Sequence, residues 1–161
     1  MTMRDYDAAR EILVARDDLA DFAGPRDERL IERAEQALGL RFPPTYRRFL
    51  SEFGAGNFGG TEIYGVIDDG FETSSVPDGI WNALEHRRDG TLPESLYEFY
   101  APGDGEAVCL DLSAPGEEAQ VVGTWPGAQA KPEILFDDFG AWLLHAVEDE
   151  LGAAGEAGEA P

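Results

Sequence analysis

The sequence predicts an α+β fold with N-terminal helices, a central mainly antiparallel sheet and a C-terminal helix packed on the sheet. Apolar residues recur at helical spacing in residues 4–53 and again after residue 137. Between these regions, strand-like segments are joined by short links that contain glycine, which is typical of an antiparallel meander. Helices in one block followed by strands in another indicate an α+β fold rather than βαβ units.

The first predicted helix covers residues 4–22 and ends at Gly24-Pro25, a strong helix breaker. Its apolar stripe consists of Ile12, Ala15, Leu19 and Phe22. This spacing places the stripe on one face, which we expect to pack on the core.

Two more helices follow with clear start and stop residues. The second runs from an N-cap at Asp27 to Leu38, and Gly39 stands where a left-handed C-cap is expected. The third begins at Pro43-Pro44, because proline fits the first helical turn, and extends to Phe53. Its apolar stripe is Tyr46, Phe49, Leu50 and Phe53.

Four strands are expected after these helices, at Thr61–Ile67, Tyr97–Ala101, Ala107–Leu112 and Gln120–Trp125. The third of them alternates, so Val108 and Leu110 should share one face and Cys109 the other. A short helix starts near Pro77-Asp78-Gly79 and ends at Asp89-Gly90.

The last helix is expected to start near Asp137-Asp138, with one of these acids as its cap. Its phase is traced by Phe139, Trp142, Leu143, Ala146 and Glu150. After Leu151 the chain contains only small residues, glutamates and a proline, which predicts a disordered acidic tail over residues 152–161. The length favours a single domain, residues 1–151.

The charge of the chain is strongly negative and uneven. Residues 1–48 hold nine basic and ten acidic residues, a net charge of −1, whereas residues 49–161 hold three basic and twenty-three acidic residues, a net charge of −20. Phosphate contacts need basic groups, so direct nucleic-acid binding is not expected. The charge predicts either a basic protein partner, whose encounter it would accelerate, or simply a well-solvated surface.

The compartment follows from the cysteine content and the apolar runs. Cys109 is the sole cysteine, so no internal disulfide can form, which fits a reducing compartment. No segment is typical of a signal peptide or of a membrane span. We therefore expect a cytoplasmic protein that does not bind membranes.

We expect no catalytic site, no metal site and no cofactor. His86 and His145 lack ligand partners at metal-binding spacing, and Cys109 lies in an apolar strand without a cationic neighbour. The glycine-rich segment 54–60 follows a helix and precedes a strand, the reverse of a phosphate-binding loop. The acid pairs do not have the spacing of a calcium-binding loop, although a catalytic carboxylate pair stays open as a minor alternative.

Partner binding is expected at acidic loops, since charges steer partners and aromatic residues anchor them. The candidate residues are Asp68, Asp69, Phe71, Glu72, Asp104, Glu106, Glu117 and Glu118. For Phe71 two alternatives remain equal, an exposed anchor or a side chain that folds back into the core.

Residues 30–65 carry the most specific pattern in the chain. An acidic helix ends at Gly39, Phe42-Pro43 follows, then Tyr46 and the Phe49-Leu50 pair, and then the glycine-rich Gly54–Asn57. This order resembles the SUKH superfamily, which is known for bacterial immunity proteins and for fungal regulators of cell-wall synthesis. Phe42 replaces the usual Leu before the proline, and Gly54-Ala55-Gly56-Asn57 replaces Asn-Gly-Gly. None of these residues is catalytic, so the resemblance implies a protein that binds another protein.

The resemblance and the charge together suggest an immunity protein, or antitoxin, that occludes a cognate toxin domain of a polymorphic toxin system. A basic toxin such as a nuclease would suit the acidic segment. The alternatives are a regulatory scaffold that binds a housekeeping protein and a carboxylate-dependent hydrolase. A neighbouring toxin gene would favour the first, and stoichiometric binding of a divalent metal would favour the last.

Overall fold

Within residues 2–114, 117–128 and 131–159, the parts of the chain that the computed structural model describes, five helices and seven strands form. Their order is α1 (Thr2–Ala15), β1 (Ala20–Phe22), α2 (Glu28–Leu38), α3 (Pro44–Glu52), β2 (Gly56–Phe58), β3 (Thr61–Ile63), α4 (Gly79–Asp89), β4 (Leu96–Tyr100), β5 (Ala107–Asp111), β6 (Val121–Thr124), β7 (Glu133–Phe136) and α5 (Phe139–Glu159). The predicted α+β class is confirmed, with helices first, then most of the strands, then a helix.

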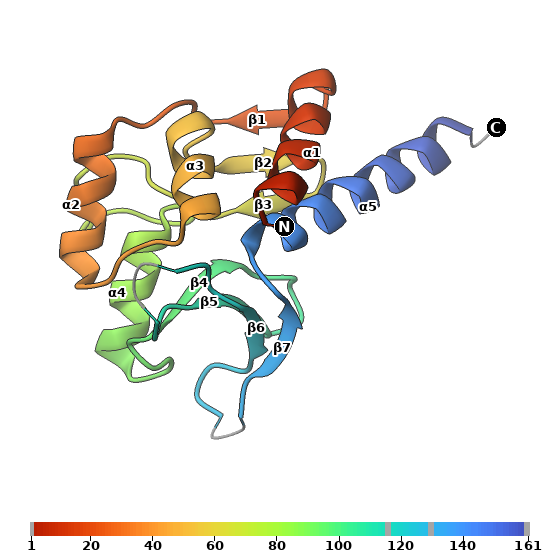
Figure 1. Cartoon of the computed structure of the whole chain (residues 1–161). Helices are drawn as coiled ribbons and strands as arrows, with labels where there is room; N and C mark the ends of the chain where they lie inside the picture. The colour runs from red at the N-terminus through yellow and green to blue at the C-terminus, as the bar shows by residue number, and fades with distance from the viewer. Residues whose placement is uncertain (1, 115–116, 129–130, 160–161) are drawn as a thin grey trace.

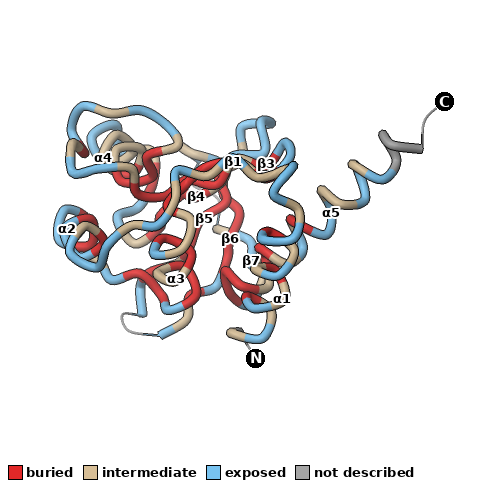
Figure 2. Tube along the Cα trace, turned by 90° about the horizontal axis from the view of Figure 1, so that it is seen from above, coloured by how far each residue is buried: buried red, intermediate tan, exposed pale blue. Residues whose placement is uncertain are grey.

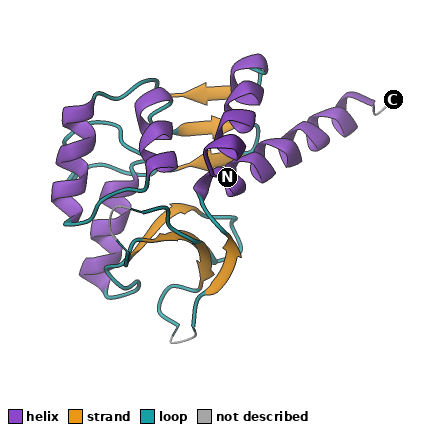
Figure 3. Cartoon of the chain, viewed as in Figure 1, coloured by secondary structure: helices purple, strands orange, loops and turns teal. Residues whose placement is uncertain are grey.

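The strands form two antiparallel sheets, in the orders β1-β2-β3 and β4-β5-β6-β7. They meet between β3 and β4, where the Tyr64 N–H donates to the Phe99 carbonyl oxygen over 2.8 Å. Figure 1 shows the first sheet level with α1 and α3 and the second sheet below it, with β7 leading into α5. The two groups of strands are separated by α4 in the chain, yet they lie next to each other in space, as the two groups of orange arrows in Figure 3 show.

The second and third helices form where their local signals predicted them. The Asp27 side chain accepts a hydrogen bond from the Leu30 N–H over 2.8 Å, and Gly39 ends α2 with a φ of 67°. α3 begins after Pro43, and its predicted stripe is buried except for Phe53, which is partly buried. Caps and periodicity act over a few residues, so they can be recognised without the rest of the fold.

The first helix is shorter than predicted. α1 ends at Ala15, and residues 20–22 form β1 instead of a further helical turn. The predicted stripe is wrong in phase: the buried residues are Tyr6, Ala9 and Leu13, while Ala15 is exposed. β1 pairs with β2, and the pairing partner lies more than thirty residues away in the chain. A strand that depends on so distant a partner gives little local signal.

The predicted strand Thr61–Ile67 is confirmed only as far as Ile63, and within the glycine-rich segment 54–60 the residues Gly56–Phe58 form the strand β2. Gly56 in β2 has a φ of 145°, and a Cβ there would lie 2.7 Å from the Phe22 Cα of β1. Close approach of two backbones, together with the positive φ, therefore explains this glycine.

The second half of the chain follows the prediction closely. α4 begins after Asp78 and ends at Gly90, and β4, β5 and β6 lie within two residues of their predicted bounds. Val108 and Leu110 of β5 join the main core, whereas Cys109 joins a smaller cluster on the opposite face, as the alternation predicted. β7 was not predicted, although Glu133–Phe136 follows a proline and contains three apolar residues.

The core lies between the helices and the two sheets, where Figure 2 shows the buried residues. Aromatic rings dominate it: Tyr46 contacts Tyr97 at 5.4 Å and Phe139 at 5.1 Å between centroids, both edge to face. The Tyr46 hydroxyl donates to the Tyr64 carbonyl oxygen, so its 2.7 Å hydrogen bond with Tyr97 must have Tyr97 as the donor. Both buried hydroxyls are thus paired, as burial requires.

α5 begins after Asp138, whose side chain accepts from the Ala141 N–H over 2.9 Å, so the predicted cap is Asp138. The helix continues past Leu151 to Glu159, through residues predicted to be a disordered tail, and its end projects from the body in Figure 1. Alanine and glutamate favour helices, which outweighs the three glycines of residues 152–159. Residues 160–161 lie outside the described part, and the single-domain boundary at residue 151 stays a prediction.

The N-cap of α4 makes stability depend on pH. Asp78 is fully buried and accepts from the N–H groups of Ile80 and Trp81, both over 3.0 Å, and burial raises the pKa of its carboxyl above 3.8. A carboxyl whose pKa is higher in the folded than in the unfolded chain stabilises the fold fully when the pH is below the unfolded-state pKa. This contribution is lost as the pH rises through the folded-state pKa. We expect Asp78→Asn to remove this loss of stability as the pH is raised above about 4, measured by urea unfolding at a series of pH values. Asp27→Asn at an exposed N-cap is the control, and parallel curves for Asp78→Asn and the parent would contradict the prediction.

Candidate protein-binding site

The eight residues predicted to bind a partner lie in three separate loops of the structure. Asp68, Asp69, Phe71 and Glu72 lie between β3 and α4, Asp104 and Glu106 lie between β4 and β5, and Glu117 and Glu118 lie between β5 and β6. No hydrogen bond or ion pair joins any two of these loops among the described residues.

In the first loop the acids are exposed but the aromatic residue is not. Asp68 accepts from the Gly70 N–H over 2.8 Å, and Glu72 lies 3.6 Å from Arg88 of α4. Phe71 is 9% exposed and packs in the main core, so it folds back rather than standing out as an anchor. The loop offers charge to a partner but no exposed ring.

In the third loop Glu118 has a structural role that the sequence did not reveal. Its carboxylate accepts from the Thr45 N–H over 3.0 Å and from the Thr45 hydroxyl over 2.7 Å, at the N-terminus of α3. Pro43 provides no side-chain cap for this helix, so Glu118 supplies one from a distant loop. Glu117 is exposed, and Pro115 and Gly116 of the same loop lie outside the described residues.

The second loop, by contrast, borders a groove. Asp104 accepts a hydrogen bond from the Glu106 N–H over 3.0 Å. The Glu106 side chain lies partly buried against β6, where its Oε2 is 2.7 Å from the place that a Cβ added to Gly123 would occupy. Burial, and then the carboxylates of Asp104 and Glu133, raise the pKa of Glu106. The loop therefore places several like charges close together.

We call this feature the α5 groove, because α5 forms one side and the second sheet forms the other. Its volume is about 230 Å³, and its lining residues are Thr61, Tyr100, Pro102, Glu106, Val108, Phe136, Trp142, His145, Ala146 and Asp149. Trp142 and Tyr100 lie 5.3 Å apart between ring centroids, and Phe136 and His145 also lie 5.3 Å apart. Rings from β4, β7 and α5 thus converge on one short groove.

The α5 groove is negatively charged without a compensating cation. None of its described lining residues is Lys or Arg, whereas Glu106 and Asp149 both line it. Burial raises the pKa of the Tyr100 hydroxyl, and the carboxylates of Glu150, Asp149 and Asp104 raise it further. Aromatic faces and carboxylates together favour a positively charged group.

The sequence predicted only Glu106 among the lining residues as a site residue, with Asp104 beside it. Trp142 was placed on the core-facing phase of the last helix, and Phe136 was missed because β7 was missed. The run Pro132-Glu133-Ile134-Leu135-Phe136 carries a strand signal that could have identified that wall. Nothing in the sequence shows that the β4–β5 loop lies against the last helix, because that contact is tertiary.

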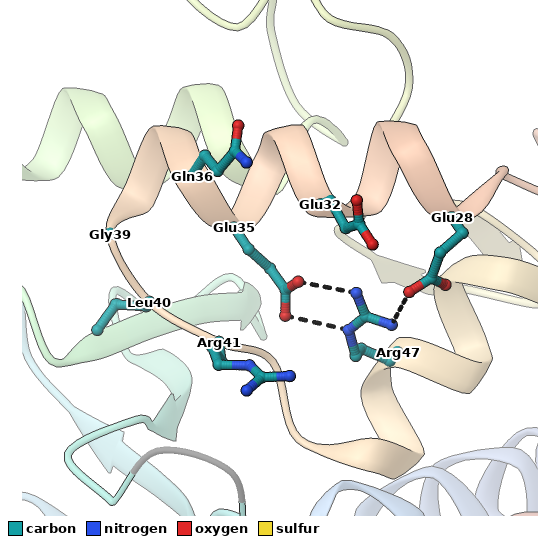
Figure 4. Close-up of a pocket in the computed structure, with 8 residues that line it drawn as sticks. All are labelled: Glu28, Glu32, Glu35, Gln36, Gly39, Leu40, Arg41 and Arg47. Carbon is teal, nitrogen blue, oxygen red and sulfur yellow. Dashed lines mark hydrogen bonds and ion pairs between the residues drawn. The ribbon is translucent and has the colours of Figure 1, made fainter.

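A larger hollow lies between α2 and α3, with a volume of about 520 Å³. We call it the α2–α3 hollow, and Figure 4 shows its lining residues Glu28, Glu32, Glu35, Gln36, Gly39, Leu40, Arg41 and Arg47. Arg47 donates to Glu28 over 2.6 Å and to both oxygens of Glu35 over 2.8 and 3.1 Å. Glu35 raises the pKa of Arg47 further above its ordinary value.

Three of the charges of the α2–α3 hollow, those of Glu28, Glu35 and Arg47, therefore serve the fold. Glu35 is 8% exposed and also accepts a hydrogen bond from the Phe42 N–H over 2.8 Å. It therefore binds both Arg47 and the segment that connects the two helices. A partner would have to displace these bonds to use the charges. We therefore prefer the α5 groove as the binding site, although it is the smaller hollow.

Two other side chains belong to reactive types, but one is held by hydrogen bonds and the other is buried. His86 on α4 bonds to the Thr91 hydroxyl over 2.7 Å and to Glu98 over 3.0 Å, and Glu98 also accepts from the Asn82 amide over 2.6 Å. Cys109 is fully buried, and burial raises the pKa of its thiol, which disfavours the reactive thiolate. The described residues contain no cluster of three His, Cys, Asp or Glu that could hold a metal ion, and none of their helices meets the length and hydropathy of a membrane span.

Comparison with known proteins gives one informative match. The family model SUKH_5, described as SMI1-KNR4 cell-wall, matches residues 7–148. No curated protein matches the chain. The matched range extends from α1 into α5 and includes nine of the ten residues that line the α5 groove, with Asp149 directly after its end.

Proposed function

The chain belongs to the SMI1-KNR4 family of the SUKH superfamily, and from this premise we propose that it is an immunity protein that neutralises a cognate bacterial toxin domain. It acts in the cytoplasm by covering the toxin, and it needs no catalytic step. This agrees with the family, which is not a known family of enzymes. The observation that carries the proposal is the α5 groove, with converging rings and uncompensated carboxylates.

A basic toxin fits this protein best. Residues 49–161 carry a net charge of −20, and the groove lies within that segment. Opposite potentials accelerate encounter and fix the orientation of two partners. A nuclease needs a basic cleft for its substrate, so an acidic surface laid over that cleft would exclude nucleic acid.

A regulatory scaffold that binds a housekeeping protein is the second candidate function. The family description, which refers to the cell wall, favours it. Both candidates bind a protein, so the identity of the partner separates them.

The proposal is tested with the protein encoded immediately upstream of this chain's gene. Its C-terminal domain should arrest growth when expressed alone, and co-expression of the full chain should restore growth and yield a stoichiometric complex. If the upstream product is harmless, or if growth stays arrested although both proteins are soluble, the immunity proposal fails. A stable complex with a cell-wall regulatory protein instead would support the scaffold.

The acidic surface also predicts a salt dependence of association. We expect the association rate constant to fall by about tenfold or more between about 0.05 M and about 0.5 M salt, because screening shortens the reach of the charges. Stopped-flow or surface-based kinetics would measure it, with the dissociation rate constant as an internal control. An association rate that is indifferent to salt would rule out electrostatic steering.

A further inference from the structure

We infer that the α5 groove receives a single arginine side chain from the partner, placed against the ring-lined wall that Tyr100, Phe136 and Trp142 form and held by Glu106 and Asp149. The inference rests on the proposed function in so far as the arginine belongs to a protein partner. It adds the chemical identity of the group that enters the groove, and four steps support it.

The first step is size. The groove holds about 230 Å³, whereas sites for drug-sized ligands typically span about 300–1,000 Å³. Its walls come from five different elements, β3, β4, β5, β7 and α5, and from the β4–β5 loop, so each element contributes only a few residues to a small space. A single long side chain matches this space better than a cofactor or a helix.

The second step is the chemistry of the walls. Trp142 is 4% exposed and contacts both Phe99 and Tyr100, so its ring is fixed by the core. Tyr100 and Phe136 are partly buried, line the groove and pack on the core, so contacts with the core hold these rings in place before any ligand arrives. A planar guanidinium stacks on aromatic faces and is weakly hydrated, so arginine suits such walls better than lysine.

The third step is the availability of the carboxylates. The side chains of Glu106 and Asp149 make no hydrogen bond or ion pair within the described residues, although Asp104, Glu133 and Glu150 lie near enough to influence the groove. A cation that enters would relieve the repulsion among these acids. Among the described residues, the only basic side chain on the lining is that of His145, which is exposed and lies against Phe136.

The fourth step is the rigidity of the groove. Glu150 of α5 accepts from the Thr61 hydroxyl over 2.8 Å and from the Gly60 N–H over 3.2 Å. These bonds tie the α5 side of the groove to the turn between β2 and β3, next to Asp149. A preformed site loses little conformational entropy on binding.

The test uses the full chain and N-acetyl-arginine-N-methylamide as the probe, with the citrulline analogue as an uncharged control of the same shape. Titration followed by NMR should shift the Trp142 indole N–H signal in a saturable way, while the signals of Trp81 and Trp125 stay in place. The citrulline analogue should leave Trp142 unshifted at the same concentrations. The double variant Glu106→Gln/Asp149→Asn should bind the probe about tenfold more weakly, because both charge contacts are removed.

Glu11→Gln is the matched control, since Glu11 is an exposed acid on α1 outside the groove. Equal binding by the double variant, non-saturable shifts spread over the acidic surface, or equal response to citrulline would each overturn the inference. The toxin complex separates the two proposals. If the double variant binds a neutralised toxin with unchanged affinity, the groove assignment is wrong while the immunity function stands. If the probe binds but no toxin is neutralised, the groove stands and the function fails.

Discussion

Replacing Gly65 by alanine should lower the free energy of unfolding by about 3 kcal/mol or more. A Cβ at this position would overlap the Gly54 carbonyl oxygen. It would also lie 2.9 Å from the Gly54 carbonyl carbon and 3.0 Å from Leu50 Cδ2, both too close for ordinary contact. Two of these atoms are backbone, so no side-chain rotation can relieve the clash.

Neither of the two facing segments can move easily. The Gly54 carbonyl oxygen accepts from the Val66 N–H over 3.1 Å, so it is bonded to the residue after Gly65. The Gly65 N–H donates to Pro77 over 2.9 Å, and its carbonyl oxygen accepts from Gly79 over 2.8 Å. An added methyl group would have to break one of these bonds, each of which fixes the entry to α4 or the end of α3.

The matched control is Gly152→Ala in α5, where nothing lies within 4 Å of the new Cβ. Alanine favours the helix over glycine, so this variant should gain about 0.5–1 kcal/mol of stability. Urea unfolding of both variants gives the two differences on one scale. A loss of less than about 1 kcal/mol for Gly65→Ala would show that the contact with Gly54 is not fixed.

The parts of the fold that the sequence predicted are those with local causes. Asp27, Gly39 and Pro43 mark helix ends by their own backbone or side-chain chemistry, and each does so in the structure. The alternation in β5 reports which side chains face the core, and it is also local. Gly65, in contrast, has an ordinary backbone conformation, and only the tertiary approach of Gly54 explains it.

The candidate site was only half predictable for the same reason. Charge could be read from the sequence, so Asp104 and Glu106 were predicted as acids in a loop, and both lie in the β4–β5 loop. Their position beside Tyr100 and Trp142 depends on how α5 packs on the second sheet, which no local signal gives. Glu118 shows the opposite outcome, because an acid that looked free for a partner is used to cap α3. Charge alone therefore cannot separate binding residues from structural ones.

The second large effect is expected at Arg47, in the α2–α3 hollow. Arg47→Ala should lower the free energy of unfolding by about 2–3 kcal/mol, because it leaves the buried Glu35 carboxylate without its two-bond partner. Glu35 would keep only the Phe42 N–H, and its side chain is 9% exposed, so water could replace little of the loss. Removal of the Glu28 contact contributes less, since that side chain is 62% exposed.

A double-mutant cycle distinguishes an ion pair from simple loss of packing. Glu35→Gln/Arg47→Met removes both charges while keeping most of the volume, and it should be more stable than Arg47→Ala because no unpaired carboxylate is buried. Arg47→Met alone keeps the packing but leaves Glu35 unpaired, so it should be less stable than the double variant. If the two are equally stable, Arg47 does not act through Glu35. Arg47→Ala should still bind the arginine probe at a temperature where it is folded, because Arg47 is not among the residues that line the α5 groove. Loss of stability with retained probe binding would identify the larger hollow as part of the scaffold and leave the smaller one as the site of recognition.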